Sequence, residues 1–448
     1  MRIDKIEVQN FKKFENECFE FPQGVSGEDH HGSFHVLVGE NGVGKTSILD
    51  AVAVALSVWL EKVPDATLKN SRRRLVADNK RLVASTGGDR TLLMQAKGDM
   101  LVKADGRILG NEISWGQSLD QGKRNISNRG SKDAIGLIEG AYSEIQDGNT
   151  RLLPVIAYYG AGRAWLPHNE RKNVKAKSNG GRSNRWEAFY DCLNDRIRLA
   201  DLNKWFLNEA IARGNREGRY RPGFQAVLRA VYGVVRGAAD LFYEPERNEI
   251  ILSIDSNPQP FSNLSAGQRT LFSLVADIAI KMVVQNNFLV PPDDLPGGIE
   301  VIPEVLSRTP GVVLIDEIDV HLHPRWQRIV AKSLKRTFPS IQFITTTHSP
   351  QVIGEMSPKE VCLLSNEGGE SPNQSFGMDT NWILDVLMEA DSQTPEVKSE
   401  LDAIYDLIQS EDLDSAHDRA MRLRQLIGNS QSLQRIISTI ERIRRLGK

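Results

Sequence analysis

Apolar runs and helical periodicities alternate along this chain, and such a pattern is typical of an α/β protein. Three continuous apolar runs are each long enough for one buried strand, at 152–159, 311–315 and 341–346. Runs of this kind are typical of parallel strands that are covered on both faces. Shorter strand-like runs lie near the start of the chain, at 2–8, 15–21 and 34–38. We therefore predict a sheet of buried parallel strands together with an antiparallel β lobe.

Helical spacing of apolar residues predicts three further regions. One helix is predicted at 47–60, and aromatic and aliphatic residues recur with helical spacing over 186–235, which indicates a helical lobe. Three amphipathic patterns near the end of the chain predict a helical appendage within 366–448, after a linker-like run that begins at Asn366. A turn is expected at 104–107, where Ala-Asp-Gly-Arg follows a strand.

Composition excludes several classes of protein. The 448 residues include 56 Lys and Arg against 58 Asp and Glu, so any contact with nucleic acid must come from local patches. The cysteines Cys18, Cys192 and Cys362 lie far apart, which argues against a disulfide framework or a zinc module. A signal peptide is not expected, because charges occupy the first five residues, and no apolar run is long enough to cross a bilayer. We expect a soluble, cytoplasmic protein without a membrane partner.

The loop Gly39–Thr46 has the spacing G-x-x-x-x-G-K-T and lies between a predicted strand and the helix at 47–60. Glycines allow the backbone to curl so that successive N–H groups point at phosphate oxygens. The helix adds its positive N-terminal end, Lys45 adds a charge for the β and γ phosphates, and the Thr46 hydroxyl is a ligand for Mg²⁺. The alternative is a glycine-rich turn, but the flanking strand and helix favour a P-loop. We therefore predict that the chain binds a nucleoside triphosphate.

Two carboxylates, Asp316 and Glu317, follow directly on the apolar strand at 311–315. Active sites of parallel sheets lie at the carboxyl ends of their strands. A buried strand rarely ends in paired carboxylates without a cation to compensate them. A cation site is therefore expected at this edge of the sheet.

Taken together, these motifs resemble those of the ABC-type ATPases, in the branch that contains the SMC, RecF and OLD proteins. Gly39–Thr46 is similar to the Walker A motif, Leu264–Gln268 to the signature motif and Val312–Glu317 to the Walker B motif. Asp319 falls in the D-loop, and His348 resembles the switch histidine. The resemblance implies a P-loop NTPase of α/β class with an ABC-type head.

The family resemblance also implies a domain organisation. The head spans 1–365, with a helical lobe inserted at about 163–262, and the appendage at 366–448 is expected to dock a partner. A full SMC-type arm is not expected, since no long heptad array separates the Walker A and signature motifs.

Roles for individual residues follow from the same resemblance. Glu317 polarises the attacking water as general base, and His348 hydrogen-bonds the γ-phosphate. Thr46 and Asp316 hold Mg²⁺. Ser265 and Gly267 contact the γ-phosphate bound by a second subunit, so that ATP holds together a head-to-tail dimer, from which higher oligomers can form. The residues implied to contact the nucleotide are Gly39, Asn41, Gly42, Gly44, Lys45, Thr46, Ser47, Ser265, Gly267, Gln268 and Asp319. ATP and Mg²⁺ are the expected cofactors.

One feature of the family, the Q-loop glutamine, is missing from this sequence. The C-terminal residues indicate which members of the family the chain resembles. The strand that ends at Tyr159 should lead into a glutamine-bearing Q-loop, yet Gly-Ala-Gly-Arg follows it. The chain carries no nuclease signature of its own. The run from Ser375 to Leu384, with the three helices after it, resembles the C-terminal part of PtuA-type ATPases of Septu and retron anti-phage systems. Those ATPases work with a separate HNH nuclease, PtuB, and such a subunit is the expected partner.

Two other functions stay open. A RecF-like DNA-repair protein would contact DNA or RNA through basic residues, for which the candidates are Arg163–Arg185 and Arg72–Arg74. The alternative for the first stretch is a solvated surface loop. A transporter ATPase subunit is disfavoured by the long insertion and by the missing Q-loop glutamine.

Overall fold

The centre of the protein is a six-stranded sheet with the strand order β15-β14-β3-β13-β12-β8. The structure is a computed structural model that describes residues 1–23, 32–65, 68, 71–86, 92–96, 98–123, 125–164, 185–365, 368–391 and 393–446. The five strands from β14 to β8 run parallel, and β15 is antiparallel to β14. The strands are β3 Ser33–Val38, β8 Val155–Tyr159, β12 Gly311–Ile315, β13 Ile341–Thr346, β14 Val361–Ser365 and β15 Gly368–Glu370. The predicted parallel sheet is confirmed.

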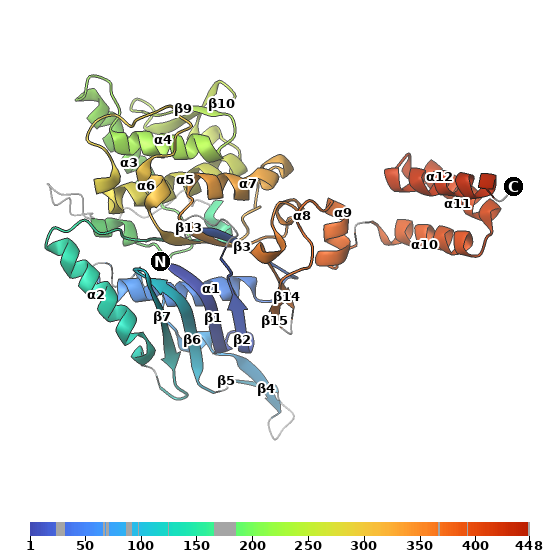
Figure 1. Ribbon diagram of the computed structural model, residues 1–448, viewed down its shortest axis with the longest axis horizontal. Helices are drawn as coiled ribbons and strands as arrows, with labels where there is room; N and C mark the ends of the chain where they lie inside the picture. Colours follow the sequence, from blue (N-terminus) through green and yellow to red (C-terminus); the bar gives the residue numbers. More distant parts are fainter. Residues whose placement is uncertain are drawn as a thin grey trace. The chain divides into compact units, whose positions relative to one another are not determined.

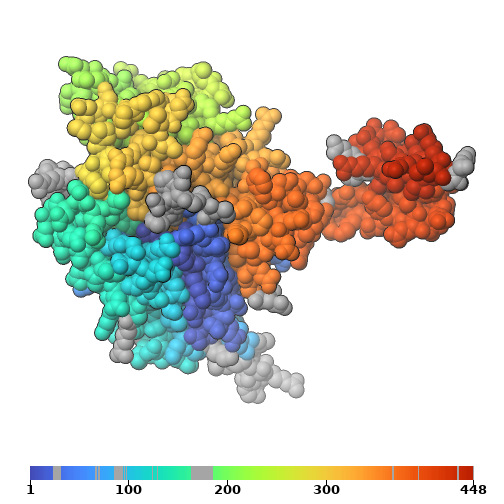
Figure 2. Space-filling model, viewed as in Figure 1, coloured from blue at the N-terminus to red at the C-terminus, as the bar shows by residue number. Residues whose placement is uncertain are grey.

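An antiparallel sheet with the order β2-β1-β6-β7 packs against one side of this centre (Figure 1). Helix α1, Lys45–Leu56, lies between the two sheets and is buried along almost its whole length. One hydrophobic core joins α1 to both sheets and to α2, Lys132–Gln146. The strands are β1 Arg2–Phe11, β2 Phe14–Glu20, β6 Met100–Ile108 and β7 Asn111–Leu119, and the small hairpin beyond them is β4 Leu82–Thr86 with β5 Leu92–Ala96. On the face shown in Figure 2, the residues near the start of the chain (dark blue) adjoin those around residue 100 (light blue to cyan).

The opposite side of the parallel sheet carries α5, Ala266–Gln285, and α7, Pro324–Thr337, with a lobe above them (Figure 1). The lobe is helical as predicted, but it also contains a three-stranded antiparallel sheet. Its elements are α3 Leu199–Gly214, α4 Pro222–Val234, β9 Ala238–Glu244, β10 Glu249–Ile254 and β11 Asn257–Pro260. Two short helices complete this side, α6 Glu304–Arg308 and α8 Pro350–Ile353.

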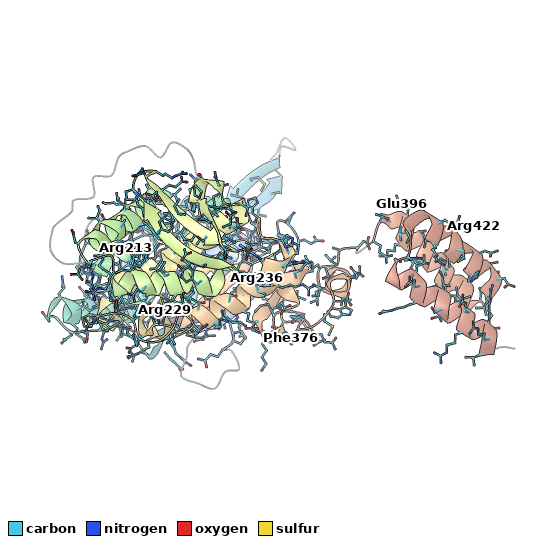
Figure 3. All side chains as sticks on the ribbon, turned by 90° about the horizontal axis from the view of Figure 1, so that it is seen from above. Arg213, Arg229, Arg236, Phe376, Glu396 and Arg422 are labelled. Carbon is cyan, nitrogen blue, oxygen red and sulfur yellow. The ribbon has the colours of Figure 1, made fainter. Side chains whose placement is uncertain are left out.

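A second compact unit comprises Asp379–Lys448. It contains α9 Thr380–Trp382, a short π-helix Ile383–Leu387, α10 Pro395–Gln409, α11 Leu413–Ile427 and α12 Gln431–Leu446. Helices α10 to α12 enclose a separate core, which includes Ile404, Ala420 and Ile440. Glu396 on α10 and Arg422 on α11 are exposed members of this unit (Figure 3). In the part of the chain that the structure describes, no helix is long and apolar enough to span a membrane.

The structure differs from three local expectations. Residues 104–107 are not a turn, because β6 continues to Ile108 with buried and half-buried residues in alternation. The run predicted as a linker after residue 365 includes β15, which pairs with β14 through Leu363 and Glu370. The first compact unit extends to Met378, beyond the predicted end of the head, and within this extension the Ser375 hydroxyl donates to the Met356 carbonyl (2.7 Å).

Gln342 on β13 connects the two sheets. Its side chain is fully buried, and its amide accepts a hydrogen bond from the Ile3 N–H (2.8 Å) and donates one to the Ile3 carbonyl (2.6 Å). Both polar groups of one β1 residue are therefore satisfied by a strand of the other sheet.

We expect Gln342→Leu to lower the free energy of unfolding by about 2–4 kcal/mol, because it leaves both backbone groups of Ile3 buried without a partner. Urea unfolding of the full chain measures the change. Gln121→Leu is the control, since Gln121 is exposed and its side chain makes no comparable bridge, and it should stay within about 0.5 kcal/mol of the wild type. Equal stabilities of the two variants would contradict the structural role of Gln342.

Candidate functional site

The P-loop, Gly39–Thr46, connects β3 to α1 and is held in place by the turn between β1 and β2. Gly44 has φ 108°, and a Cβ at this position would lie 2.5 Å from the Phe14 ring. Only glycine tolerates both the left-handed backbone and this close approach. The Lys13 ammonium donates to the Gly42 carbonyl (3.0 Å). The hairpin between the first two strands therefore fixes the shape of the loop.

Lys45 is folded back into the loop. Its ammonium donates to the carbonyls of Gly39 (2.7 Å) and Glu40 (2.9 Å), and only 8% of the residue is exposed. Burial lowers the pKa of Lys45, although the carboxylates of Asp316, Glu317 and Asp319 act in the opposite direction. A half-desolvated ammonium surrounded by carbonyls can exchange these neutral acceptors for stronger, anionic phosphate oxygens.

Asp316 receives hydrogen bonds on both carboxylate oxygens. The Thr46 hydroxyl at the start of α1 donates to one (3.0 Å), and the Thr346 hydroxyl at the end of β13 donates to the other (2.6 Å). The residue is 6% exposed, whereas Thr46 is exposed. A hydroxyl and a carboxylate side by side are the oxygen donors that Mg²⁺ prefers. Thr46 and Asp316 therefore fit a magnesium ion bound together with a nucleotide.

Glu317 has an unusual backbone conformation directly after β12. Its φ is 48°, in the left-handed region that non-glycine residues seldom occupy, and its N–H donates to the Thr346 hydroxyl oxygen (2.7 Å). Non-glycine residues in this region are held there at a cost of about 1–3 kcal/mol, and they cluster at functional sites. The same threonine thus holds the backbone of Glu317 and the side chain of Asp316.

Asp319 ties the segment after β12 to the segment after β13. Its carboxylate accepts hydrogen bonds from the Thr347 hydroxyl and from the His348 N–H (3.3 Å). His348 itself is half-buried. The resemblance implies that Asp319 contacts the nucleotide. In this structure its carboxylate binds Thr347 and the backbone of His348 in the same chain.

The signature motif begins helix α5. Ser265 is the N-cap, and it exchanges hydrogen bonds with Gln268, whose N–H donates to the serine hydroxyl (3.3 Å) and whose side chain accepts from the Ser265 N–H (2.9 Å). A Cβ on Gly267 would lie 2.3 Å from the His321 carbonyl, so the helix start rests against the segment just after Asp319. Ser265 itself is exposed.

The predicted residues thus form two groups. Lys45, Thr46, Asp316 and Glu317 lie at one junction between α1, β12 and β13, and the Asp319–His348 contact lies beside it. The signature residues approach this junction through Gly267 and the His321 carbonyl. Sequence reasoning missed Thr346, although three consecutive threonines at the end of a buried strand were a signal that hydroxyls were needed there.

The expected basic patches need correction. Arg72 is almost buried, pairs with Glu61 (2.8 Å) and donates to the carbonyls of Leu60 and Glu61. Arg73 pairs with Asp50 on α1 (2.7 Å). Both guanidinium groups are therefore used inside the protein, because tertiary contacts neutralise charges that look free in the sequence.

The other basic stretch, Arg163–Arg185, lies largely outside the described residues, which resume at Arg185. The Arg185 guanidinium donates to the Gln285 carbonyl (2.5 Å), and it lies 5.2 Å from the centre of the Phe288 ring. This end of the stretch is anchored on the helix α5 side of the protein.

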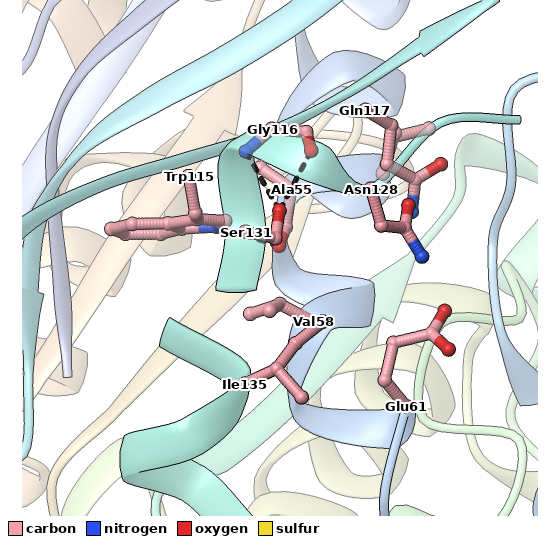
Figure 4. Close-up of a pocket in the computed structure, with 10 residues that line it drawn as sticks. Ala55, Val58, Glu61, Trp115, Gly116, Gln117, Asn128, Ser131 and Ile135 are labelled. Carbon is pink, nitrogen blue, oxygen red and sulfur yellow. Dashed lines mark hydrogen bonds between the residues drawn. The ribbon is translucent and has the colours of Figure 1, made fainter. Parts of the chain in front are cut away.

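A small cavity behind α1 is a different feature from the nucleotide site. Its volume is about 10 Å³, roughly the space of one water molecule (Figure 4). Trp115, Glu61 and Ile135 help to line it, and the Ser131 hydroxyl bridges the N–H and carbonyl of Gly116 beside it. The cavity is too small for a nucleotide.

Comparisons with known proteins find AAA domains and ATPase-named relatives. A family model described as "AAA domain" matches residues 5–211, and an AAA-domain model whose description also names the AbiEii toxin and Type IV TA system matches residues 240–354. The "Retron Vc95 probable ATPase" of Vibrio cholerae serotype O1 biovar El Tor is 26% identical over 89% of this chain and 81% of its own length.

Two further relatives match over shorter shares of their length. The "Retron Ec83 probable ATPase" of Escherichia coli is 37% identical over 38% of this chain, and the "Septu protein PtuA" of Bacillus mycoides (strain KBAB4) is 27% identical over 82% of it. This chain spans only 29% of the first and 41% of the second.

SMC head domains are among the solved structures that match this chain, with TM-scores below 0.5. One is described as the SmcHead bound to the C-winged helix domain of ScpA, with a TM-score of 0.44 and 17% identity over 83% of this chain and 98% of that one. The SMC head domain from Thermotoga maritima has a TM-score of 0.38 and 15% identity over 84% of this chain and 100% of that one. On the strength of the sequence relatives and the P-loop architecture, the chain is similar to the ABC-type ATPases of the SMC/RecF/OLD branch, and within them to PtuA and the retron ATPases.

Proposed function

We propose that this protein binds and hydrolyses ATP as the regulatory ATPase of an anti-phage defence complex. The observation that carries the proposal is one continuous set of hydrogen bonds through Thr46, Asp316, Thr346 and Glu317, beside the buried Lys45. These groups supply a charge for phosphate, oxygen donors for Mg²⁺ and a carboxylate that can accept a proton. They come from α1, β12 and β13, at the edge of the sheet where α/β proteins bind their ligands.

Each residue has a distinct task in the proposed reaction. Lys45 leaves the carbonyls of Gly39 and Glu40 and binds the β and γ phosphates. Thr46 and Asp316 hold Mg²⁺, which neutralises phosphate charge when it is bound. Glu317 accepts the proton of the attacking water as general base. His348 hydrogen-bonds the γ-phosphate and registers its loss.

ATP also joins two copies of the chain head to tail in this proposal. Support comes from the exposed N-cap Ser265 at the start of the 20-residue helix α5, because the N-terminal end of a long helix attracts phosphate. Ser265, Gly267 and Gln268 of one copy contact the nucleotide held by the P-loop of the other. ATP binding then changes the geometry of the dimer.

The partner under control is a separate HNH-type nuclease. Support comes from relatives named as retron ATPases and Septu protein PtuA, and from the second compact unit, Asp379–Lys448, which has its own core. A small helical unit of this kind can present a docking surface without disturbing the nucleotide site. We propose that this unit holds the nuclease.

A second candidate function is direct, ATP-dependent binding of nucleic acid. The observation that favours it is a basic surface on helix α7. Helix α7 carries five basic residues and no acidic one. Arg325, Arg328 and Lys332 are exposed and follow one another at spacings of three and four, so they share a face of the helix. Among the residues that the structure describes, none of the three forms an ion pair. Such a row of charges is suited to consecutive phosphates of a nucleic-acid backbone.

Other arginines nearby differ from this row. The Arg229 guanidinium donates to the carbonyls of Leu295, Pro296, Gly297 and Val301, and Arg336 donates to the Gly233 carbonyl. Arg229 and the exposed Arg236 both lie at the surface of the lobe (Figure 3). Because Arg72 and Arg73 are paired within the protein, the face with Arg325, Arg328 and Lys332 is the basic surface to test, whereas of the predicted cluster only Arg74 is exposed.

Glu317→Gln should bind ATP but lower kcat by about 10²–10⁴-fold, since the proton of the attacking water loses its acceptor. The ATP-bound dimer should then persist in size-exclusion chromatography with light scattering. Lys45→Ala should lose nucleotide affinity and with it the dimer. Glu355→Gln removes an exposed carboxylate of the same unit and should behave as wild type. Normal turnover in Glu317→Gln would contradict the assignment of the general base.

Deletion of residues 379–448 should abolish retention of a co-expressed HNH nuclease in a pull-down and leave ATP hydrolysis within about twofold of wild type. The deletion follows the boundary between the compact units, so the core of the head stays intact. ATP hydrolysis by the truncated chain controls for misfolding. Undiminished nuclease retention would place the docking surface elsewhere.

Arg328→Gln with Lys332→Gln should weaken duplex DNA binding uniformly across sequences and reduce the slope of log affinity against log salt by about 2. Fluorescence anisotropy across a salt series measures this slope. Arg216→Gln with Arg219→Gln removes the same charge from exposed positions after α3 and serves as the control. An unchanged slope in the α7 variant would remove this surface from consideration.

A further inference from the structure

A second, larger cavity lies where the edge strands of the two sheets meet. Its volume is about 420 Å³, within the range of pockets that hold small molecules. Among the lining residues that the structure describes, none belongs to the P-loop or to the strand end at Asp316. Strand β15 lies beside β2 (Figure 1), and a Cβ on Gly369 would lie 2.8 Å from the Cys362 sulfur and 3.1 Å from the Phe19 ring. The glycine therefore leaves room that a side chain would fill.

Two cysteines line this cavity, and their surroundings differ. Cys18 on β2 is exposed, and the charge of its sulfur raises the pKa of Lys5 on β1, so the ammonium near the sulfur stays protonated. Cys362 on β14 is half-buried, and burial raises the pKa of its thiol to about 12. Exposed sulfurs near a cation react as nucleophiles, whereas buried thiols with a raised pKa are inert. Cys18 is therefore the reactive sulfur of the cavity.

Charged groups of both signs surround the reactive sulfur. Glu20 lies two residues further along β2 and so shares the face of the cysteine, and Glu370 comes from β15. Lys359 contributes a positive charge just before β14. All three are exposed, and none of them forms an ion pair with a residue that the structure describes. Glu360 also lines the cavity but pairs with Lys335 (2.7 Å). Two carboxylates and one ammonium are thus available to a ligand.

The buried wall of the cavity adds an uncharged polar ring. His35 on β3 is only 3% exposed, and burial, with Arg2 and Lys335 in the same direction, lowers its pKa to about 3. The Ser33 hydroxyl accepts from the Arg2 guanidinium (2.8 Å) and lies 2.9 Å from the His35 Nε2, so its own proton is available to that nitrogen. The ring proton then belongs on Nδ1. A ligand that carries both charges and acceptor atoms therefore suits this cavity.

We propose that the cavity recognises a small zwitterionic disulfide, of the kind formed by oxidation of a thiol-bearing peptide, and that Cys18 exchanges with it. The ligand's ammonium groups pair with Glu20 and Glu370, and its carboxylates pair with Lys359. The Cys18 sulfur attacks one ligand sulfur, so a new S–S bond forms as the ligand's own S–S bond breaks. The other half of the ligand leaves as a thiolate and takes up a proton in place of the one that Cys18 released. Cys18 is oxidised, and the departing half is reduced.

Oxidised glutathione is the probe, because it carries ammonium and carboxylate groups on both halves. Incubated in excess with the full chain, it should add one glutathionyl group at Cys18, located by mass spectrometry of the digested protein. Cys18→Ser should lose this modification. Cys362→Ser is the matched control, since it removes the other thiol of the same cavity and should react like wild type. An unmodified Cys18 in the wild type would overturn the proposal.

Glu20→Gln with Glu370→Gln separates recognition by the cavity from the reactivity of any exposed thiol. Exchange with oxidised glutathione should slow about threefold to tenfold, because two exposed ion pairs with the ligand are lost. Exchange with neutral hydroxyethyl disulfide, which has no ammonium group, should keep its rate. Asp293→Asn with Glu300→Gln removes the same charge from exposed positions outside the cavity and should slow neither reaction.

General electrostatics predicts the opposite result for the cavity variant. Oxidised glutathione is an anion near neutral pH, so removal of negative charge from the protein would speed its approach if no group recognised its ammonium. Equal or faster exchange of Glu20→Gln with Glu370→Gln would therefore overturn recognition by the cavity. The proposal does not depend on ATP, so its failure would leave the proposed ATPase function untouched.

Discussion

The positions of the two carboxylates in the site depend on hydrogen bonds to the Thr346 hydroxyl. It donates to Asp316 and accepts from the N–H of Glu317, so one fully buried atom sets the position of both carboxylates. It can do so because β12 and β13 are neighbours in a parallel sheet and end at the same edge. The register between β12 and β13 therefore fixes the positions of Asp316 and Glu317 relative to each other. The hydrogen bond from the Glu317 N–H also holds this residue in its left-handed backbone conformation.

The site also links the two sides of the sheet by direct contacts. Asp319 holds the residues Thr347 and His348, and two residues further along the chain the His321 carbonyl rests against Gly267 at the start of α5. If His348 registers the loss of a phosphate as proposed, these contacts connect it directly to the start of α5. On the other side, Asp50 joins α1 to Arg73. Contiguous contacts of this kind can couple two sites when the helices and strands they connect have two alternative conformations.

Local motifs were predictable from the sequence, and partners distant in the chain were not. Lys45 and Asp316 have roles that their immediate neighbours reveal, namely a glycine-rich loop and an apolar strand. Arg73 looked like part of a free basic cluster, because its partner Asp50 is 23 positions away and meets it only in the folded protein.

The head and the Asp379–Lys448 unit each bury apolar residues of their own. In the proposed complex, ATP would control the nuclease in one of two ways. The nuclease would also touch the head, or dimerisation of the heads would bring two bound nucleases together. In the second case the hydrogen bonds at Thr346 would govern the nuclease only through the lifetime of the dimer.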